Sequence, residues 1–186
     1  MKFVGQPLGG LFEFEYPRFS DERGEFAKPF HSGSLSEYGL SADFKEFFYS
    51  DSHKDVLRGM HFQLPPHAHG KLIFVSRGCV LDVVLDVRHA SPTFGEYVSF
   101  ELCADDQRCL YISPGFAHGF LSRENNSRIN YLVTSVHSPA HDAGVRWDSF
   151  GFKWPVSSPI VSPRDADFLT LEDFQKSDDI DWHTNL

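Results

Sequence analysis

Short apolar runs alternate with turn-forming residues along most of this chain. Glycine, proline, asparagine and aspartate recur between the runs, where they favour turns. The runs themselves are rich in β-branched and aromatic residues, which favours strands. We expect strands at residues 71–75, 79–87, 97–102, 109–112 and 129–133. Several short strands at this spacing predict an all-β sandwich or barrel.

Helical signals are few. Residues 35–38 predict a short helical turn, in which Ser34 is the N-cap and Glu37 completes a capping box. The segment after Asp165 is acidic and weakly patterned, so we expect a solvated tail with one helical turn. A length of 186 residues suits a single domain over the whole chain, residues 1–186.

Composition narrows the classes of partner. The net charge of -9 argues against a nucleic-acid partner, because phosphate backbones are held by basic surfaces. A small anion can still bind where basic residues cluster. The segment 1–10 has no apolar core of signal-peptide length, and no stretch is long and apolar enough to span a membrane. A soluble cytoplasmic protein is therefore expected, with no membrane partner.

The cysteines support the same compartment. Cys79, Cys103 and Cys109 are odd in number and form no CxxC pair. A disulfide framework is therefore not expected, and a reducing compartment is the default.

Two of the ten histidines stand out by their context. His61 lies in LRGMHFQ and His118 in PGFAHGF, so both have glycine and aromatic neighbours. A partly buried imidazole with a tunable pKa is expected in such surroundings. Taken alone, a core histidine is the commoner interpretation of either residue, and the neighbouring motifs reverse that preference.

Those motifs resemble, in constant order, the signature segments of the dTDP-4-dehydrorhamnose 3,5-epimerase family. The segments are DERGEF (21–26), LRGMHFQ (57–63), GKL (70–72), DVVLDVRHASPTFG (82–95), ISPGFAHGF (112–120), the pairs WD (147–148) and WP (154–155), and SPRD (162–165). Such a series, from about residue 12 to 165, is far more specific than a lone motif. It implies a double-stranded β-helix (cupin or jelly-roll barrel) with short peripheral helices, usually a homodimer.

The resemblance implies inversion of C3, C5 or both in a nucleotide-linked 4-keto-6-deoxyhexose, in deoxysugar and polysaccharide biosynthesis, without a cofactor. Removing a proton next to a ketone and returning one to the opposite face requires a base, an acid and stabilisation of the enolate. His61 is the predicted base, and Asp165 would fix its tautomer. Tyr131 matches the family's acid, although a packed barrel tyrosine is the plain alternative. Lys71, by family position, lies near the substrate carbonyl.

Further positions imply substrate contacts. Arg58 and His118 would contact the diphosphate or the sugar, since the guanidinium fork suits phosphate. An ion pair with a carboxylate is the alternative for Arg58. Arg23 and Phe26 match positions that reach into the neighbouring subunit's site, so the sites would be shared across the dimer. Their alternatives are a surface salt bridge and a core strand residue, respectively.

Three departures from the family pattern concern the nucleotide. Lys28 stands where the family has a glutamate that accepts a hydrogen bond from thymine N3–H. Residues 47–50 (FFYS) replace a Gln-Asp-Asn run, and His137 replaces a tyrosine that stacks on thymine. Cytosine N3 is an acceptor, which suits a lysine. We therefore hypothesise CDP or another non-thymidine nucleotide; in the alternative, Lys28 turns to solvent.

Other functions remain open at this stage. A metal cupin could use His67, His69 and His118, because an H-x-H pair on a strand puts both rings on one face. Lys71 follows where such proteins carry a carboxylate, and Pro65-Pro66 predicts a loop, so no metal is expected. A nucleotide-sugar 3,4-ketoisomerase and a non-catalytic sugar-nucleotide-binding cupin are the remaining alternatives. The R-G-x-H segment and the presence of both His61 and Tyr131 favour the epimerase.

Overall fold

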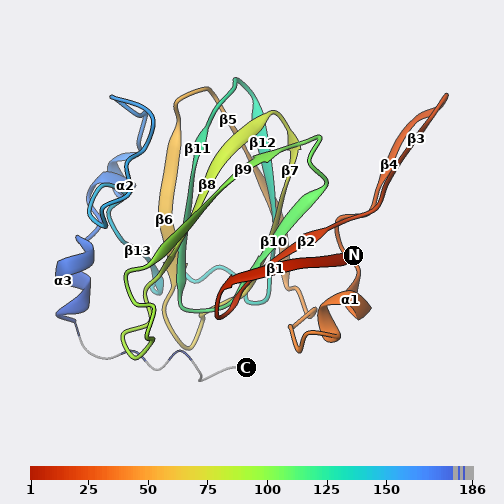
Figure 1. The fold of residues 1–186 in the computed structure, drawn as a ribbon. Helices are drawn as coiled ribbons and strands as arrows, with labels where there is room; N and C mark the ends of the chain where they lie inside the picture. The colour runs from red at the N-terminus through yellow and green to blue at the C-terminus, as the bar shows by residue number, and fades with distance from the viewer. Residues whose placement is uncertain (178–179, 181, 183–186) are drawn as a thin grey trace.

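Two antiparallel sheets face each other and form a flattened barrel in the computed structural model, which describes residues 1–177, 180 and 182 (Figure 1). The six-stranded sheet has the order β1 (Lys2–Leu8), β2 (Leu11–Glu15), β10 (Arg108–Ile112), β7 (Lys71–Arg77), β12 (Ser127–Val133) and β5 (Glu46–Ser52). The five-stranded sheet has the order β13 (Asp142–Gly144), β6 (Leu57–Gln63), β11 (Phe116–Ser122), β8 (Cys79–Asp86) and β9 (Tyr97–Cys103). The predicted double-stranded β-helix of the jelly-roll type is confirmed.

The five predicted strands all occur, as β7, β8, β9, β10 and β12. Their inward side chains and those of the neighbouring strand β11 form one apolar core between the sheets, which includes Val84, Phe100, Leu110, Phe116 and Ile129. Strand β8 is buried along nearly its whole length because both of its faces are covered. The central strands of the barrel are thus packed on both faces. This close packing holds the strands that carry the site in fixed positions.

The second face of the five-stranded sheet is covered by the C-terminal segment with α2 (Pro163–Ala166) and α3 (Leu171–Gln175) (Figure 1). Phe174 and Trp182 pack edge-on against Phe62 of β6, with ring centroids 5.4 and 5.7 Å away. The expected helical turn is therefore present as α3. The expectation of a solvated tail is wrong over the described residues, because these two aromatic side chains are buried.

The first helix, α1 (Ser32–Ser36), begins earlier than predicted. His31 is the N-cap and its side chain accepts a hydrogen bond from the Ser34 backbone N–H. Ser34 lies inside the helix, where its hydroxyl accepts a bond from the N-terminal amine, and Glu37 is the C-cap. The predicted capping box is wrong because an imidazole acceptor replaces the serine. No helix in the described residues is long and apolar enough to cross a membrane.

A two-stranded hairpin, β3 (Arg18–Asp21) and β4 (Gly24–Ala27), projects from the barrel into solvent (Figure 1). Phe19 and Phe26 are 65% and 61% exposed, and their rings stack on each other at 6.5 Å. Phe26 is therefore not a core strand residue. Arg18 fixes the base of the hairpin by donating to the Ala104 carbonyl and by pairing with Asp105.

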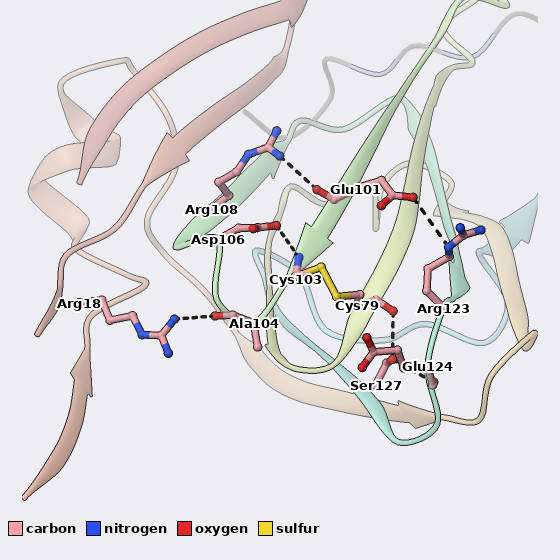
Figure 2. The surroundings of a disulfide bond; sticks show 10 residues. All are labelled: Arg18, Cys79, Glu101, Cys103, Ala104, Asp106, Arg108, Arg123, Glu124 and Ser127. Carbon is pink, nitrogen blue, oxygen red and sulfur yellow. Dashed lines mark hydrogen bonds and ion pairs between the residues drawn. A yellow bond between two sulfur atoms is a disulfide. The ribbon is translucent and has the colours of Figure 1, made fainter. Parts of the chain in front are cut away.

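Cys79 and Cys103 form a disulfide bond at one end of the β8–β9 pair (Figure 2). The register places the two residues directly opposite each other, although they are 24 positions apart in the sequence. The expectation of no disulfide is wrong because strand register, which brings the thiols together, is not visible as a CxxC spacing. Cys109 is the free, buried cysteine, and burial raises the pKa of its thiol to about 12.

Candidate active site

A cavity of about 220 Å³ opens between the two sheets at one end of the barrel. Strands β5, β7 and β12 of the six-stranded sheet supply one wall, and β6 and β11 supply the other. Most of the predicted site residues line it: Arg58, His61, Lys71, His118, Tyr131 and His137. Because all of them except His137 lie on strands, their positions are set by the barrel; His137 lies in the segment that follows β12.

His61 and Asp165 lie in contact, with 3.0 Å between His61 Nε2 and Asp165 Oδ1. Asp165 is only 2% exposed and its second oxygen accepts the Gly59 backbone N–H at 3.0 Å. Ser162 caps α2 by accepting the Asp165 backbone N–H, which orients the carboxylate toward β6. The contact predicted between His61 and Asp165 is thus present in the structure, and their catalytic roles stay a prediction.

Close approach of β6 and β11 allows this arrangement. Gly59 has φ of +142°, and a Cβ there would lie 2.5 Å from the Gly119 Cα. Only glycine fits at that point, which explains the glycine beside the histidine in the LRGMHFQ segment. Next to it, His61 and His118 are direct partners across the β6–β11 ladder. Both imidazoles therefore stand side by side in one wall.

The electrostatics of the dyad favour a neutral base beside a charged carboxylate. Burial lowers the pKa of His61, and the Asp165 carboxylate opposes that effect only in part. Burial by itself would raise the pKa of Asp165, but the adjacent His61 and the hydrogen bonds from Gly59 and Arg164 outweigh it and hold the pKa well below its usual range. His61 is therefore available to accept a proton near neutral pH.

Lys71 spans the cavity from the opposite sheet. Its ammonium donates to the His61 backbone carbonyl at 2.9 Å, and the residue is 7% exposed. Burial lowers the pKa of Lys71 to about 8, although Asp142 and Asp82 favour its charged form. A buried cation that bonds a neutral carbonyl keeps much of its charge available for a developing enolate oxygen.

Tyr131 lies on β12, in the wall that faces His61. Its ring stacks on Phe48 of β5 at 4.8 Å and meets His118 edge-on at 6.0 Å. Burial raises the pKa of Tyr131 beyond the usual range of a phenol, and the nearby Ser50 hydroxyl opposes this in part. The side chain is thus held as a neutral O–H donor on the face of the cavity opposite the base.

Two further residues that were predicted to contact the substrate have defined partners within the protein. His118 Nε2 lies 2.7 Å from the Asp82 carboxylate, and both residues are buried. Arg58 donates to the Ser52 hydroxyl and to the Asp51 carbonyl. Within the described residues Arg58 pairs with no carboxylate, so the alternative of an ion pair is wrong. Its positive charge is available to an anionic ligand.

The three predicted hairpin residues lie apart from this cavity. Phe26 belongs to β4, Lys28 follows it, and Arg23 stands in the turn, where it pairs with Asp21. The surface salt bridge considered for Arg23 is therefore present. None of the three lines the cavity of its own chain.

Arg164 is the residue that sequence reasoning missed. It lines the cavity, and its guanidinium contacts His61, Asp142 and Asp165. Its place in the SPRD segment, directly before Asp165, was the available signal. Glu46, Phe48 and His69 also line the cavity; His69 had been considered only as a metal ligand and Phe48 only as part of the segment 47–50.

The histidines considered for a metal have other partners. His69 contacts Gln63 at 3.0 Å, while the His67 ring packs against His141 at 4.5 Å. Burial lowers the pKa of His69 to about 3, so it is neutral. The described part of the chain contains no group of three or more metal-binding side chains. The cavity instead combines a base, a phenol and an ammonium, which together can move a proton on a carbon acid.

Comparison with known proteins gives a consistent result. The family model described as dTDP-4-dehydrorhamnose 3,5-epimerase matches residues 6–173. The dTDP-4-dehydrorhamnose 3,5-epimerase of Shigella flexneri is 39% identical over 168 residues, 89% of this chain and 93% of the relative. Among solved structures, NovW of Streptomyces spheroides, a 4-keto-6-deoxy sugar epimerase, has a TM-score of 0.91 and 31% identity, and the match covers 95% and 90% of the two chains.

The dTDP-4-dehydrorhamnose 3,5-epimerase of Bacillus anthracis, solved with TDP and PPi bound, has a TM-score of 0.87 and 34% identity. That match covers 91% of this chain and 98% of the Bacillus protein. Sequence and architecture therefore agree over nearly the whole chain, and the protein belongs to the dTDP-4-dehydrorhamnose 3,5-epimerase family.

Proposed function

We propose that this protein inverts C3, C5 or both of a nucleotide-linked 4-keto-6-deoxyhexose, without a cofactor. One observation carries the proposal. His61 stands in one sheet with Asp165 of α2 against it, Tyr131 stands in the facing sheet, and the Lys71 ammonium spans the space between them. An acid and a base on opposite sides of an enolate are what inversion of a carbon requires.

In the proposed reaction His61 removes the proton next to the C4 ketone, and the electron pair moves onto the C4 oxygen. The Lys71 ammonium stabilises that enolate oxygen. Tyr131 then donates its phenolic proton to the opposite face of the same carbon. Asp165 stabilises the imidazolium that His61 has become, and proton exchange with solvent restores both groups. No oxidant, reductant or metal takes part in these steps.

The cavity is smaller than the roughly 300–1,000 Å³ typical of ligand pockets, since its volume is about 220 Å³. It suits the sugar, and Arg58 and His118, which line it, would contact the sugar or the diphosphate. The nucleotide would then lie outside it. The exposed hairpin with Arg23, Phe26 and Lys28 suits the role of an arm that completes the site of a second subunit in a homodimer.

Two alternatives involve the same cavity. A 3,4-ketoisomerase would also pass through an enolate but would move the carbonyl group. A non-catalytic binding protein would exchange no proton. The joint presence of a buried dyad and a buried phenol favours the epimerase over a binding protein. The cytoplasmic location stays a prediction, and the Cys79–Cys103 disulfide does not support it, because such bonds are rare in a reducing cytosol.

Solvent deuterium distinguishes these activities. In D2O the protein should replace the C3 or C5 hydrogen of dTDP- or CDP-4-keto-6-deoxyglucose and release the inverted sugar, as followed by proton NMR. A His61→Asn variant should lose about 100-fold or more of this exchange, the usual contribution of a general base. Tyr131→Phe should keep exchange but lose inversion, because His61 can still return deuterium to the face it attacks.

Tyr111→Phe is the matched control, since Tyr111 is a buried tyrosine of β10 that does not line the cavity. Exchange that survives in His61→Asn would remove His61 as the base. Appearance of a 3-keto product would indicate the ketoisomerase.

The pH dependence of turnover should be bell-shaped. Activity falls as pH drops through the lowered pKa of His61, because the base becomes protonated. It also falls as pH rises through about 8, where Lys71 loses its charge. In a Lys71→Arg variant the alkaline fall should move to higher pH, since a guanidinium does not titrate there. An unchanged alkaline limb would show that Lys71 does not set it.

Shared sites can be tested by mixing two weak variants. His61→Asn lacks the base, and Arg23→Gln lacks the hairpin contact offered to the other subunit. A mixed dimer restores one complete site, so a refolded equimolar mixture should regain about a quarter of wild-type activity under random pairing. Sedimentation should give twice the chain mass of 21.2 kDa. A monomer, or a mixture without recovery, would contradict the shared site.

Nucleotide preference follows from Lys28. If its ammonium donates to cytosine N3, calorimetry should show CDP binding about tenfold more tightly than dTDP, the usual value of one charge-assisted hydrogen bond. Lys28→Glu should reverse the order, whereas Lys54→Glu, a charge change on another exposed turn, should leave it unchanged. A clear preference of the wild-type protein for dTDP would reject the proposal and return Lys28 to solvent.

A further inference from the structure

One ring nitrogen of His61 has two neighbours of opposite kind. Asp165 Oδ1, an acceptor, lies 3.0 Å from His61 Nε2, and Arg164 Nη2, a donor, lies 2.8 Å from the same atom. A neutral imidazole nitrogen either carries a proton and donates, or lacks one and accepts. The two contacts therefore cannot be hydrogen bonds at the same time, and they favour opposite tautomers of His61.

The choice of tautomer decides whether His61 can act. If Arg164 donates to Nε2, the proton of the neutral ring sits on Nδ1, and Nδ1 has no lone pair for the substrate. If Asp165 accepts from Nε2, the lone pair on Nδ1 is free to take the proton next to the ketone. The contact with Arg164 thus holds the base in its inactive form.

Arg164 is anchored in a way that allows exchange. Its Nη1 donates to Asp142 at 2.7 Å and its Nε to Asp165 at 3.0 Å, so the fork is held against the cavity wall. The side chain is nevertheless 53% exposed, and water screens such ion pairs. The exposed guanidinium can therefore turn away from His61 when another anion receives it, and the buried Asp165 then keeps the Gly59 N–H and gains the proton of His61 Nε2 as partners.

The other groups around His61 do not compete for Nε2. The Lys71 ammonium binds the backbone carbonyl, His118 is paired with Asp82, and the Phe168 ring meets the imidazole edge-on at 5.7 Å. Lys71 and Arg164 both lower the pKa of His61, whereas Asp165 raises it. Arg164 is hence the single exposed group of the described surroundings that can leave and change the state of the base.

We propose that Arg164 is a positioning residue: it occupies His61 Nε2 in the resting protein and turns to the diphosphate of the substrate on binding, which returns Nε2 to Asp165. This inference rests on the proposed function, because it takes a nucleoside diphosphate as the anion. A guanidinium fork suits phosphate oxygens, and Arg164 already lines the cavity. The base is thereby switched on only when an anionic substrate is present.

Nitrogen NMR of histidine-labelled protein tests this directly, since the chemical shifts of Nδ1 and Nε2 report the tautomer. The His61 signals are identified by their loss in His61→Asn. In the wild-type protein His61 should carry its proton on Nδ1, and saturation with dTDP, or CDP in a parallel sample, should move it to Nε2. Arg164→Met should show the Nε2 tautomer without nucleotide and should bind the nucleotide about tenfold more weakly.

Arg146→Met serves as the control, because Arg146 pairs with Asp148 outside the cavity. A His61 proton on Nε2 in the wild-type protein without nucleotide, or a tautomer that Arg164→Met leaves unchanged, would overturn the inference. Should neither nucleotide bind, the proposed function fails instead, while the comparison of wild type with Arg164→Met still decides the role of Arg164.

Discussion

The site depends on the contacts of the buried Asp165 carboxylate. It accepts hydrogen bonds from the Gly59 backbone and lies against His61, so it ties the C-terminal segment to β6. A carboxylate buried without such partners would be strongly unfavourable. The same contacts that satisfy its charge therefore fix the histidine, the end of the barrel and the short helix α2 as one unit. Stability and reactivity are coupled at this point.

Residue patterns predicted the central strands of the barrel better than its other strands and its site. The five strands were found because each is a short apolar run rich in β-branched and aromatic residues and bounded by turn residues. Strand β11 was not named, since every one of its residues is buried and glycine and histidine interrupt the apolar pattern. The hairpin β3–β4 was also missed, because its side chains are almost all exposed and show no buried face.

The residues of the site were also predicted only in part. His61 and Asp165 are 104 positions apart, and no spacing rule joins them; only the family resemblance placed the two together in advance. Arg164 was overlooked because an arginine beside a carboxylate normally looks like a solvated pair. Its role depends on the distance to one ring nitrogen, which only the three-dimensional structure supplies. The departures at Lys28 and His137, in contrast, could be seen in the sequence once it was compared with the family pattern.

The disulfide at the end of β8 and β9 makes the protein sensitive to its surroundings. Closing a loop with a sequence separation of 24 restricts the unfolded chain, and the chain-entropy view assigns such a loop about 3 kcal/mol. That is a large share of the roughly 5–15 kcal/mol by which domains are stable. The oxidised and the reduced forms of the protein therefore differ in their free energy of unfolding. The thiol content of a purification buffer decides which form is obtained.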